Sequence, residues 1–68
     1  MNYSKIVEIA TQCLVKQNQI TEYYRLLGAN PNIEDICKKL IYTTIDEMKL
    51  ELKKLESKLH KQINPYDI

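Results

Sequence analysis

Residues 28–32 read GANPN, and this is the only internal stretch where residues that interrupt helices cluster. It holds the single glycine of the chain, Gly28, and the first of its two prolines, Pro31. Glycine commonly closes a helix in a left-handed conformation, and asparagine followed by proline commonly opens one. We therefore expect a turn here, with Gly28 ending one helix and either Asn30 or Asn32 capping the next.

The second proline, Pro65, ends the other long segment, because the residue before a proline avoids the helical region. Two uninterrupted segments remain, at about 3–27 and about 32–63. The chain is long enough for one small domain. We expect a single domain over 1–68 that consists of two helices, the turn and a short tail at 64–68.

Both segments carry an apolar stripe whose members recur at alternating steps of three and four, the spacing of a helix that packs against one partner. The predicted stripe of the first segment is Ile6, Ala10, Cys13, Gln17, Ile20, Tyr24 and Leu27. That of the second is Ile41, Ile45, Met48, Leu52, Leu55 and Leu59, with Ile33 and Cys37 leading into it. The polar stretch KQNQIT (16–21) leaves open whether the first helix breaks near Asn18.

A short loop between two long helices favours an antiparallel hairpin, so the expected fold is all-α. With a turn centred near residue 30, Ile6 is expected opposite Leu55 and Gln17 opposite Ile45. Apolar stripe positions then meet apolar counterparts, with Gln17 as the exception. The two cysteines of the chain lie far apart in this register, which excludes an intramolecular disulfide.

One seam between two helices leaves large apolar side chains on its flanks, among them Val7 and Leu14. A dimer that forms a four-helix bundle would cover both flanks, so we expect self-association, with docking onto another protein as the alternative. Tyr23 is expected to face outward as an interface anchor. The candidate partner-binding residues are Tyr23, Ile36, Leu40, Tyr42, Leu50, Ile63 and Tyr66.

The residue types needed for catalysis or cofactor binding do not converge. Two cysteines and the single His60 do not make a four-ligand zinc site, and there is no glycine-rich loop to hold a phosphate. Neighbouring carboxylates such as Asp46 and Glu47 point in different directions on a helix. We expect no enzymatic activity, no metal and no cofactor.

Lysines gather in the second segment, where five of them lie between residues 49 and 61 together with Glu51 and Glu56. A nucleic-acid surface usually also uses arginine and interleaved aromatic residues, but Arg25 is the only arginine and lies in the first segment. The pattern favours a solvated helix face. In the alternative, nucleic acid would be contacted by Lys53, Lys54, Lys58 and Lys61.

The totals place this chain among globular proteins, with 44% hydrophobic and 28% charged residues and a net charge of +1. No apolar run approaches the roughly 20 residues of a membrane span, and the start does not resemble a signal peptide. We expect a cytoplasmic protein that does not enter membranes. Its richness in Ile, Lys, Asn and Tyr is typical of an AT-rich genome or a phage.

The expected function is that of a small protein–protein interaction module, such as an adaptor, an inhibitor or a regulatory subunit. It would act through self-association and an apolar flank, without catalysis. The alternative is a nucleic-acid-binding regulator that uses the lysine-rich second helix.

Overall fold

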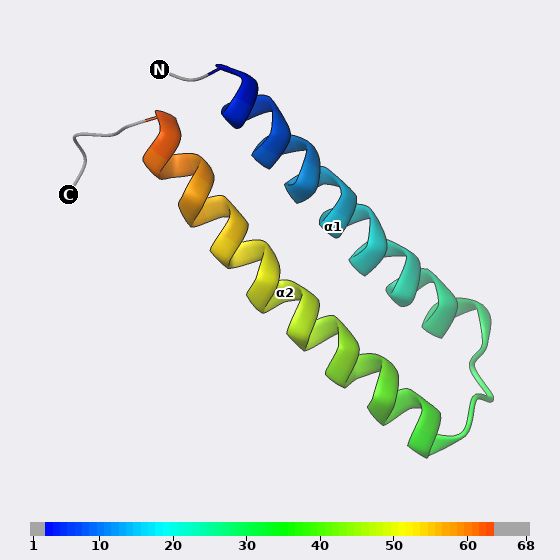
Figure 1. Cartoon of the computed structure of the whole chain (residues 1–68). Helices are drawn as coiled ribbons and strands as arrows, with labels where there is room; N and C mark the ends of the chain where they lie inside the picture. Colours follow the sequence, from blue (N-terminus) through cyan, green and yellow to red (C-terminus); the bar gives the residue numbers. More distant parts are fainter. Residues whose placement is uncertain (1–2, 64–68) are drawn as a thin grey trace.

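The chain folds into two long α-helices joined by a short turn (Figure 1). This computed structural model describes residues 3–63. Helix α1 spans Tyr3–Ala29 and helix α2 spans Asp35–Ile63. The helices run antiparallel and pack along each other, which confirms the predicted all-α helical hairpin.

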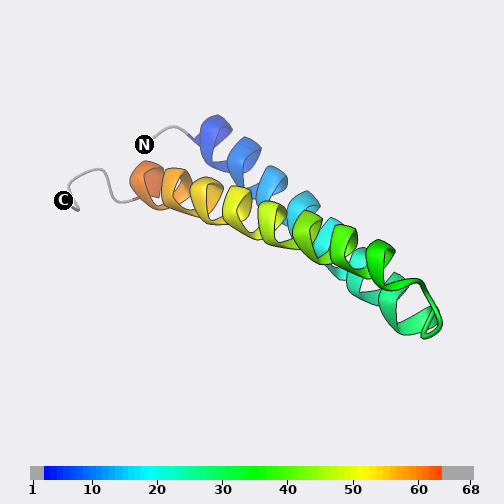
Figure 2. The same ribbon diagram turned by 90° about the horizontal axis from the view of Figure 1, so that it is seen from below.

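The hairpin is a single layer of helices. It measures 49 × 20 × 11 Å, and the shortest dimension is close to the diameter of one helix. Figure 2 shows the two helices crossing at a shallow angle, so that α1 passes behind α2 toward the turn. Because there is no second layer within residues 3–63, each helix has only the other one to pack against.

The turn lies two residues later than the sequence predicted, at residues 30–34. Gly28 belongs to α1 and does not have a positive φ, so the prediction that it closes the helix in a left-handed conformation is wrong. Asn30 ends the helix instead. Its backbone N–H donates to the Leu26 carbonyl at 3.1 Å, and its side-chain amide donates to the same carbonyl at 2.9 Å.

Helix α2 begins at Asp35 and not at residue 32 as predicted. The Ile33 N–H donates to the Asn30 carbonyl at 3.2 Å, which holds the chain in a turn before the helix starts. The Lys38 N–H then donates to the Glu34 carbonyl at 3.0 Å, as in a first helical turn. Neither asparagine of the turn caps α2. The carboxylates of Glu34 and Asp35 lie at its positive end, where the helix dipole favours negative charge.

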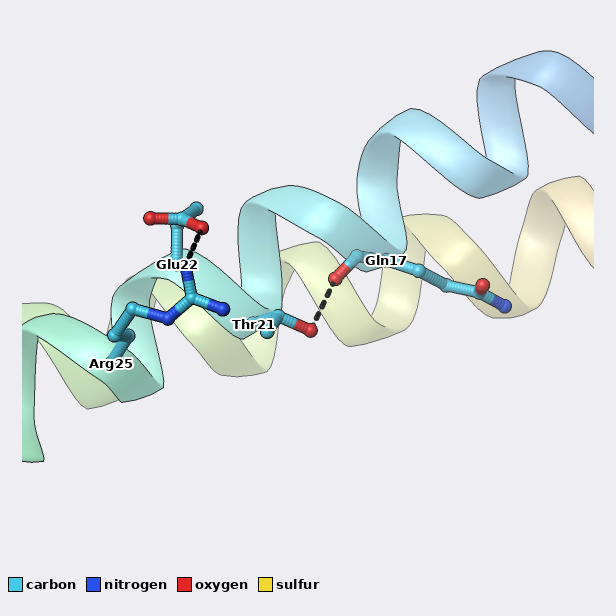
Figure 3. A network of polar contacts seen from close by, with 4 residues as sticks. All are labelled: Gln17, Thr21, Glu22 and Arg25. Carbon is cyan, nitrogen blue, oxygen red and sulfur yellow. Dashed lines mark hydrogen bonds and ion pairs between the residues drawn. The ribbon is translucent and has the colours of Figure 1, made fainter.

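Helix α1 continues without a break through the polar stretch 16–21. The Thr21 hydroxyl donates to the Gln17 carbonyl at 3.0 Å, one turn back along the helix (Figure 3). One turn further on, Arg25 Nη1 lies 2.8 Å from Glu22 Oε1. These local contacts are compatible with a continuous helix, and there is no break near Asn18.

The stripe predicted for α2 lies along the seam between the helices. Ile45 is only 1% exposed, and the remaining stripe members of α2 are half-buried. These half-buried members are Ile41, Met48, Leu52, Leu55 and Leu59. The stripe predicted for α2 is therefore confirmed.

The stripe predicted for α1 is wrong at alternate positions. The buried residues of α1 are Ile9, Cys13 and Ile20, while Lys16 and Tyr23 are half-buried. The residues predicted at the three misassigned positions, Ala10, Gln17 and Tyr24, are all exposed. At the first of these positions Ile9 is buried in place of Ala10, which removes more apolar area from water. The other two exchange Gln17 for Lys16 and Tyr24 for Tyr23.

The helices are also paired in a different register from the predicted one. Gln17 was expected opposite Ile45, but the neighbouring Lys16 reaches Glu51, with Nζ and Oε2 2.7 Å apart. Because the turn is centred two residues later, the residue opposite any given position of α1 lies about four residues further along α2. The long side chains of Lys16 and Glu51 span the remaining displacement. Cys13 is buried, Cys37 is half-buried, and both are free thiols.

We expect Ile45→Ala to lower the free energy of unfolding by about 2–4 kcal/mol, because it leaves a cavity at the most buried point of the seam. Denaturant unfolding followed by far-UV circular dichroism, at constant protein concentration, measures this loss. Leu50→Ala on the exposed side of the same helix is the control and should change stability by less than about 0.5 kcal/mol. Equal losses would show that Ile45 is not central to the seam.

Candidate interaction faces

The described residues expose more large apolar side chains than they bury. Only four apolar residues are buried, while eleven large apolar side chains are exposed. Single exposed apolar residues are ordinary on protein surfaces, but so many on a two-helix chain are a feature of its surface. Four of them lie on α1 before the middle of the helix, namely Tyr3, Val7, Leu14 and Val15.

A cation–π contact marks one side of the hairpin, because Lys49 Nζ of α2 lies 5.3 Å from the ring centroid of Tyr24 in α1. Residues seven apart occupy the same side of a helix, so this side continues along both helices at that spacing, with Val7 and Leu14 one turn from its α1 members. We call it the tyrosine face. Its members at this spacing are Tyr3, Ala10, Gln17 and Tyr24 of α1 and Asp35, Tyr42, Lys49, Glu56 and Ile63 of α2. Val7 and Leu14 border them on α1, and Asp46 and Lys53 take the equivalent places on α2.

The other side of the hairpin carries an open groove of about 480 Å³ between the helices. We call this side the groove face. The ion pair between Lys16 and Glu51 bridges the groove, and the stem of Lys16 is largely covered while its ammonium reaches the carboxylate. Val15 and Leu55 add apolar lining, and Lys54 and Lys58 line the same groove.

The two inter-helix contacts perturb the charged groups that form them. A hydrogen bond from Lys16, followed by the charge of that ammonium, lowers the pKa of the exposed Glu51 carboxyl below its ordinary value. A hydrogen bond with Tyr24, the charge of the same residue when ionised, and the nearby Asp46 raise the pKa of Lys49. Both ions are in contact with water, so salt will screen these effects.

Charge is divided unequally between the helices. Helix α1 has five charged residues in 27 positions, whereas α2 has twelve in 29. On the tyrosine face, α1 contributes no charged residue, whereas α2 contributes Asp35, Lys49 and Glu56, with Asp46 and Lys53 at its border. Interface centres are depleted in charged residues and enriched in tyrosine, so this face of α1 has the composition of a surface that packs against protein.

The structure places the predicted partner-binding residues on different sides. Tyr23 was expected to face outward, but it is half-buried and lines a shallow hollow together with Met48 of α2. Tyr24 is the outward tyrosine, with 44% of its surface exposed. Ile36, Leu40, Tyr42, Leu50 and Ile63 are all exposed as predicted. Tyr66 lies outside the described residues.

Sequence reasoning missed Tyr3 and Tyr24 as exposed tyrosines. The available signal was the exact seven-residue spacing of Tyr3, Ala10, Gln17 and Tyr24, but most of that series was assigned to the seam. Exposed and seam stripes have the same spacing in a helical hairpin, so spacing alone cannot separate them.

The four lysines proposed for nucleic-acid contact are exposed but do not form one strip. Lys54, Lys58 and Lys61 follow helical spacing on one side of α2, and the first two line the groove. Lys53 is turned by about 100° from Lys54. Glu51 lies in the same groove and offsets part of the positive charge.

Among residues 3–63 there is no group of three or more His, Cys, Asp or Glu side chains that could hold a metal ion. Neither helix, over the part of the chain that is described, is long and apolar enough to cross a membrane.

The fold defines a two-helix antiparallel hairpin with two chemically distinct sides. Searches of protein-family models, of curated proteins and of solved structures each find no match to this chain. The interpretation of function therefore depends on the two faces themselves.

We expect Lys16→Met to return the pKa of Glu51 toward its ordinary value. The folded-state pKa is depressed, so the pair contributes stability above the ordinary glutamate pKa and loses it as the pH falls through the folded value. Carbon-13 NMR titration of the Glu51 carboxyl measures the change. Lys58→Met, which removes another lysine of the groove, is the control. A Glu51 pKa that is unchanged in Lys16→Met would contradict the assigned cause.

Proposed function

We propose that this hairpin is a protein–protein interaction module that works by self-association and does not catalyse a reaction. An adaptor, an inhibitor or a regulatory subunit would fit this description. The observation that carries the proposal is the imbalance between four buried and eleven exposed large apolar side chains in the described part of the chain.

The energetics of a small chain support the same conclusion. A chain below about 70–80 residues rarely obtains more than about 3–5 kcal/mol from its core unless disulfides, metals or oligomerisation contribute. Both cysteines are free thiols, and residues 3–63 hold no cluster of metal ligands. Packing against a second copy would supply further burial, and two hairpins packed together would make a four-helix bundle.

The distribution of lysines favours this function over nucleic-acid binding. Phosphate contacts need a continuous basic surface, but the exposed lysines of α2 alternate with Glu47, Glu51 and Glu56. Lys16 and Lys49 are engaged by Glu51 and Tyr24 of the opposite helix. Helix α1 has few charges to add.

Sedimentation equilibrium over about 1–100 μM should give an average mass that rises with concentration and reaches at least twice the 8.0 kDa of the chain. A constant mass of 8.0 kDa across this range would overturn the proposal. Binding to mixed-sequence DNA or RNA at about 50 mM salt that weakens steeply as salt is added would also overturn it, in favour of a nucleic-acid-binding regulator.

A further inference from the structure

We infer that the tyrosine face is the self-association surface, and that two copies pair across a two-fold axis with α1 antiparallel to α1 and α2 antiparallel to α2. This inference depends on the proposed self-association and adds which face is used and in which orientation. Its basis is that the pattern of residues on this face is complementary to its own reverse.

The strip on α2 shows this property most clearly. Tyr42, Lys49, Glu56 and Ile63 are each seven residues apart, and all four are exposed. Asp35, one step before Tyr42, has no counterpart within residues 3–63 in this pairing. If a second copy runs in the opposite direction over this strip, Tyr42 meets Ile63 and Lys49 meets Glu56. An apolar side chain therefore faces an apolar one, and an ammonium faces a carboxylate. Each contact occurs twice because of the two-fold symmetry. Among residues 3–63, Glu56 has no ion-pair partner within its own chain.

The strip on α1 is also compatible with reversal. Tyr3, Ala10, Gln17 and Tyr24 are evenly spaced, so a reversed copy places Tyr3 against Tyr24 and Ala10 against Gln17. Leu14 then lies next to the axis and packs against Leu14 of the second copy. Lys53 takes the equivalent place on α2, where its flexible stem lets the ammonium turn away from the axis into water. Because α1 has no charged residue on this strip, pairing it with itself buries no ion.

Both strips must share one axis, and the hairpin register allows it. The midpoint of the α2 strip falls between residues 52 and 53, and that of the α1 strip falls between residues 13 and 14. The Lys16–Glu51 ion pair shows that these parts of the helices lie at the same height. Both of its residues are on the turn side of their midpoints, and the two midpoints agree in height to within the reach of these two side chains. The spacing within either strip does not depend on the register, so this agreement is independent support.

The other two-fold arrangement places α1 of one copy over α2 of the other. It would set Lys49 and Glu56 against the uncharged strip of α1, where each ion would lose water without gaining a partner. Charge complementarity therefore selects the arrangement that pairs like helices.

The size of the face is adequate for a stable dimer. The broad side of the hairpin measures 49 × 20 Å, an area of about 1,000 Å², and a standard interface buries about 800 Å² on each partner. The groove face stays on the outside of such a dimer, which keeps Lys16, Glu51, Lys54 and Lys58 in water.

The face is tested by a pair of matched leucines. Leu14 is 60% exposed on the tyrosine face, and Leu50 is 57% exposed on α2, off that face. Leu14→Lys brings two ammonium groups together at the axis, and we expect its dimer dissociation constant, measured by sedimentation equilibrium, to rise at least about tenfold. Leu50→Lys should leave the constant unchanged. Circular dichroism checks that both variants keep their helices.

The outcomes separate this inference from the proposed function. If Leu14→Lys dimerises as tightly as the wild type, the tyrosine face is not the interface, although self-association still holds. If the wild-type chain itself is monomeric, the proposed function fails and this inference fails with it.

The orientation is tested by charge reversal at the two ionic positions. Lys49→Glu and Glu56→Lys each place like charges opposite one another at both symmetric contacts, and each should weaken the homodimer about tenfold at low salt. An equimolar mixture of the two variants restores opposite charges at both contacts and should form heterodimers with wild-type affinity. Native mass spectrometry with one variant ¹⁵N-labelled detects them.

The mixture also controls for the loss of the Lys49–Tyr24 contact. That contact lies within one chain, so mixing the variants cannot restore it, and recovered affinity must come from the contacts between chains. Single variants that dimerise like the wild type would rule out the antiparallel pairing, because position 49 would then not face position 56. Weakened single variants whose mixture is equally weak would rule it out as well.

Discussion

Two helices can bury only the stripe that each turns toward the other, and the remaining properties of this hairpin depend on that limit. The seam hides Ile9, Cys13, Ile20 and Ile45, and no further layer covers the outer sides within residues 3–63. Apolar residues beyond the seam must therefore lie in water or against another molecule. The free energy gained by covering them is not available to the isolated chain.

The unequal charge of the helices makes their outer surfaces differ in how easily they can leave water. Helix α2 mixes lysine and glutamate with exposed apolar residues such as Leu40 and Leu50, whereas the outer surface of α1 is rich in Tyr, Val, Leu and uncharged polar residues. A surface of that kind loses little by leaving water. This is the physical basis for proposing an interaction module.

The sequence predicted the fold class, the number of helices and the seam stripe of α2, because Ile, Met and Leu at helical spacing contrast sharply with the charged residues around them. The same reasoning failed for α1, which has few charges to mark its solvent side. The predicted seam stripe of α1 and the observed one share Ile6, Cys13, Ile20 and Leu27, and they differ only at the positions between these residues. Gln17 was placed in the seam by its spacing alone, whereas Lys16 borders the seam because its ammonium reaches Glu51.

The sequence by itself therefore determined that the chain is a helical hairpin with a single turn near Pro31, since helical periodicity and helix-breaking residues are local properties. Only the tertiary structure decided which side of α1 is buried, where the turn closes and which residues are opposed. Those features depend on the relative rotation and displacement of two helices, and that arrangement is set by the total burial and by contacts between the helices. The exposure of Tyr24 and the alignment of the two strips of the tyrosine face follow from it.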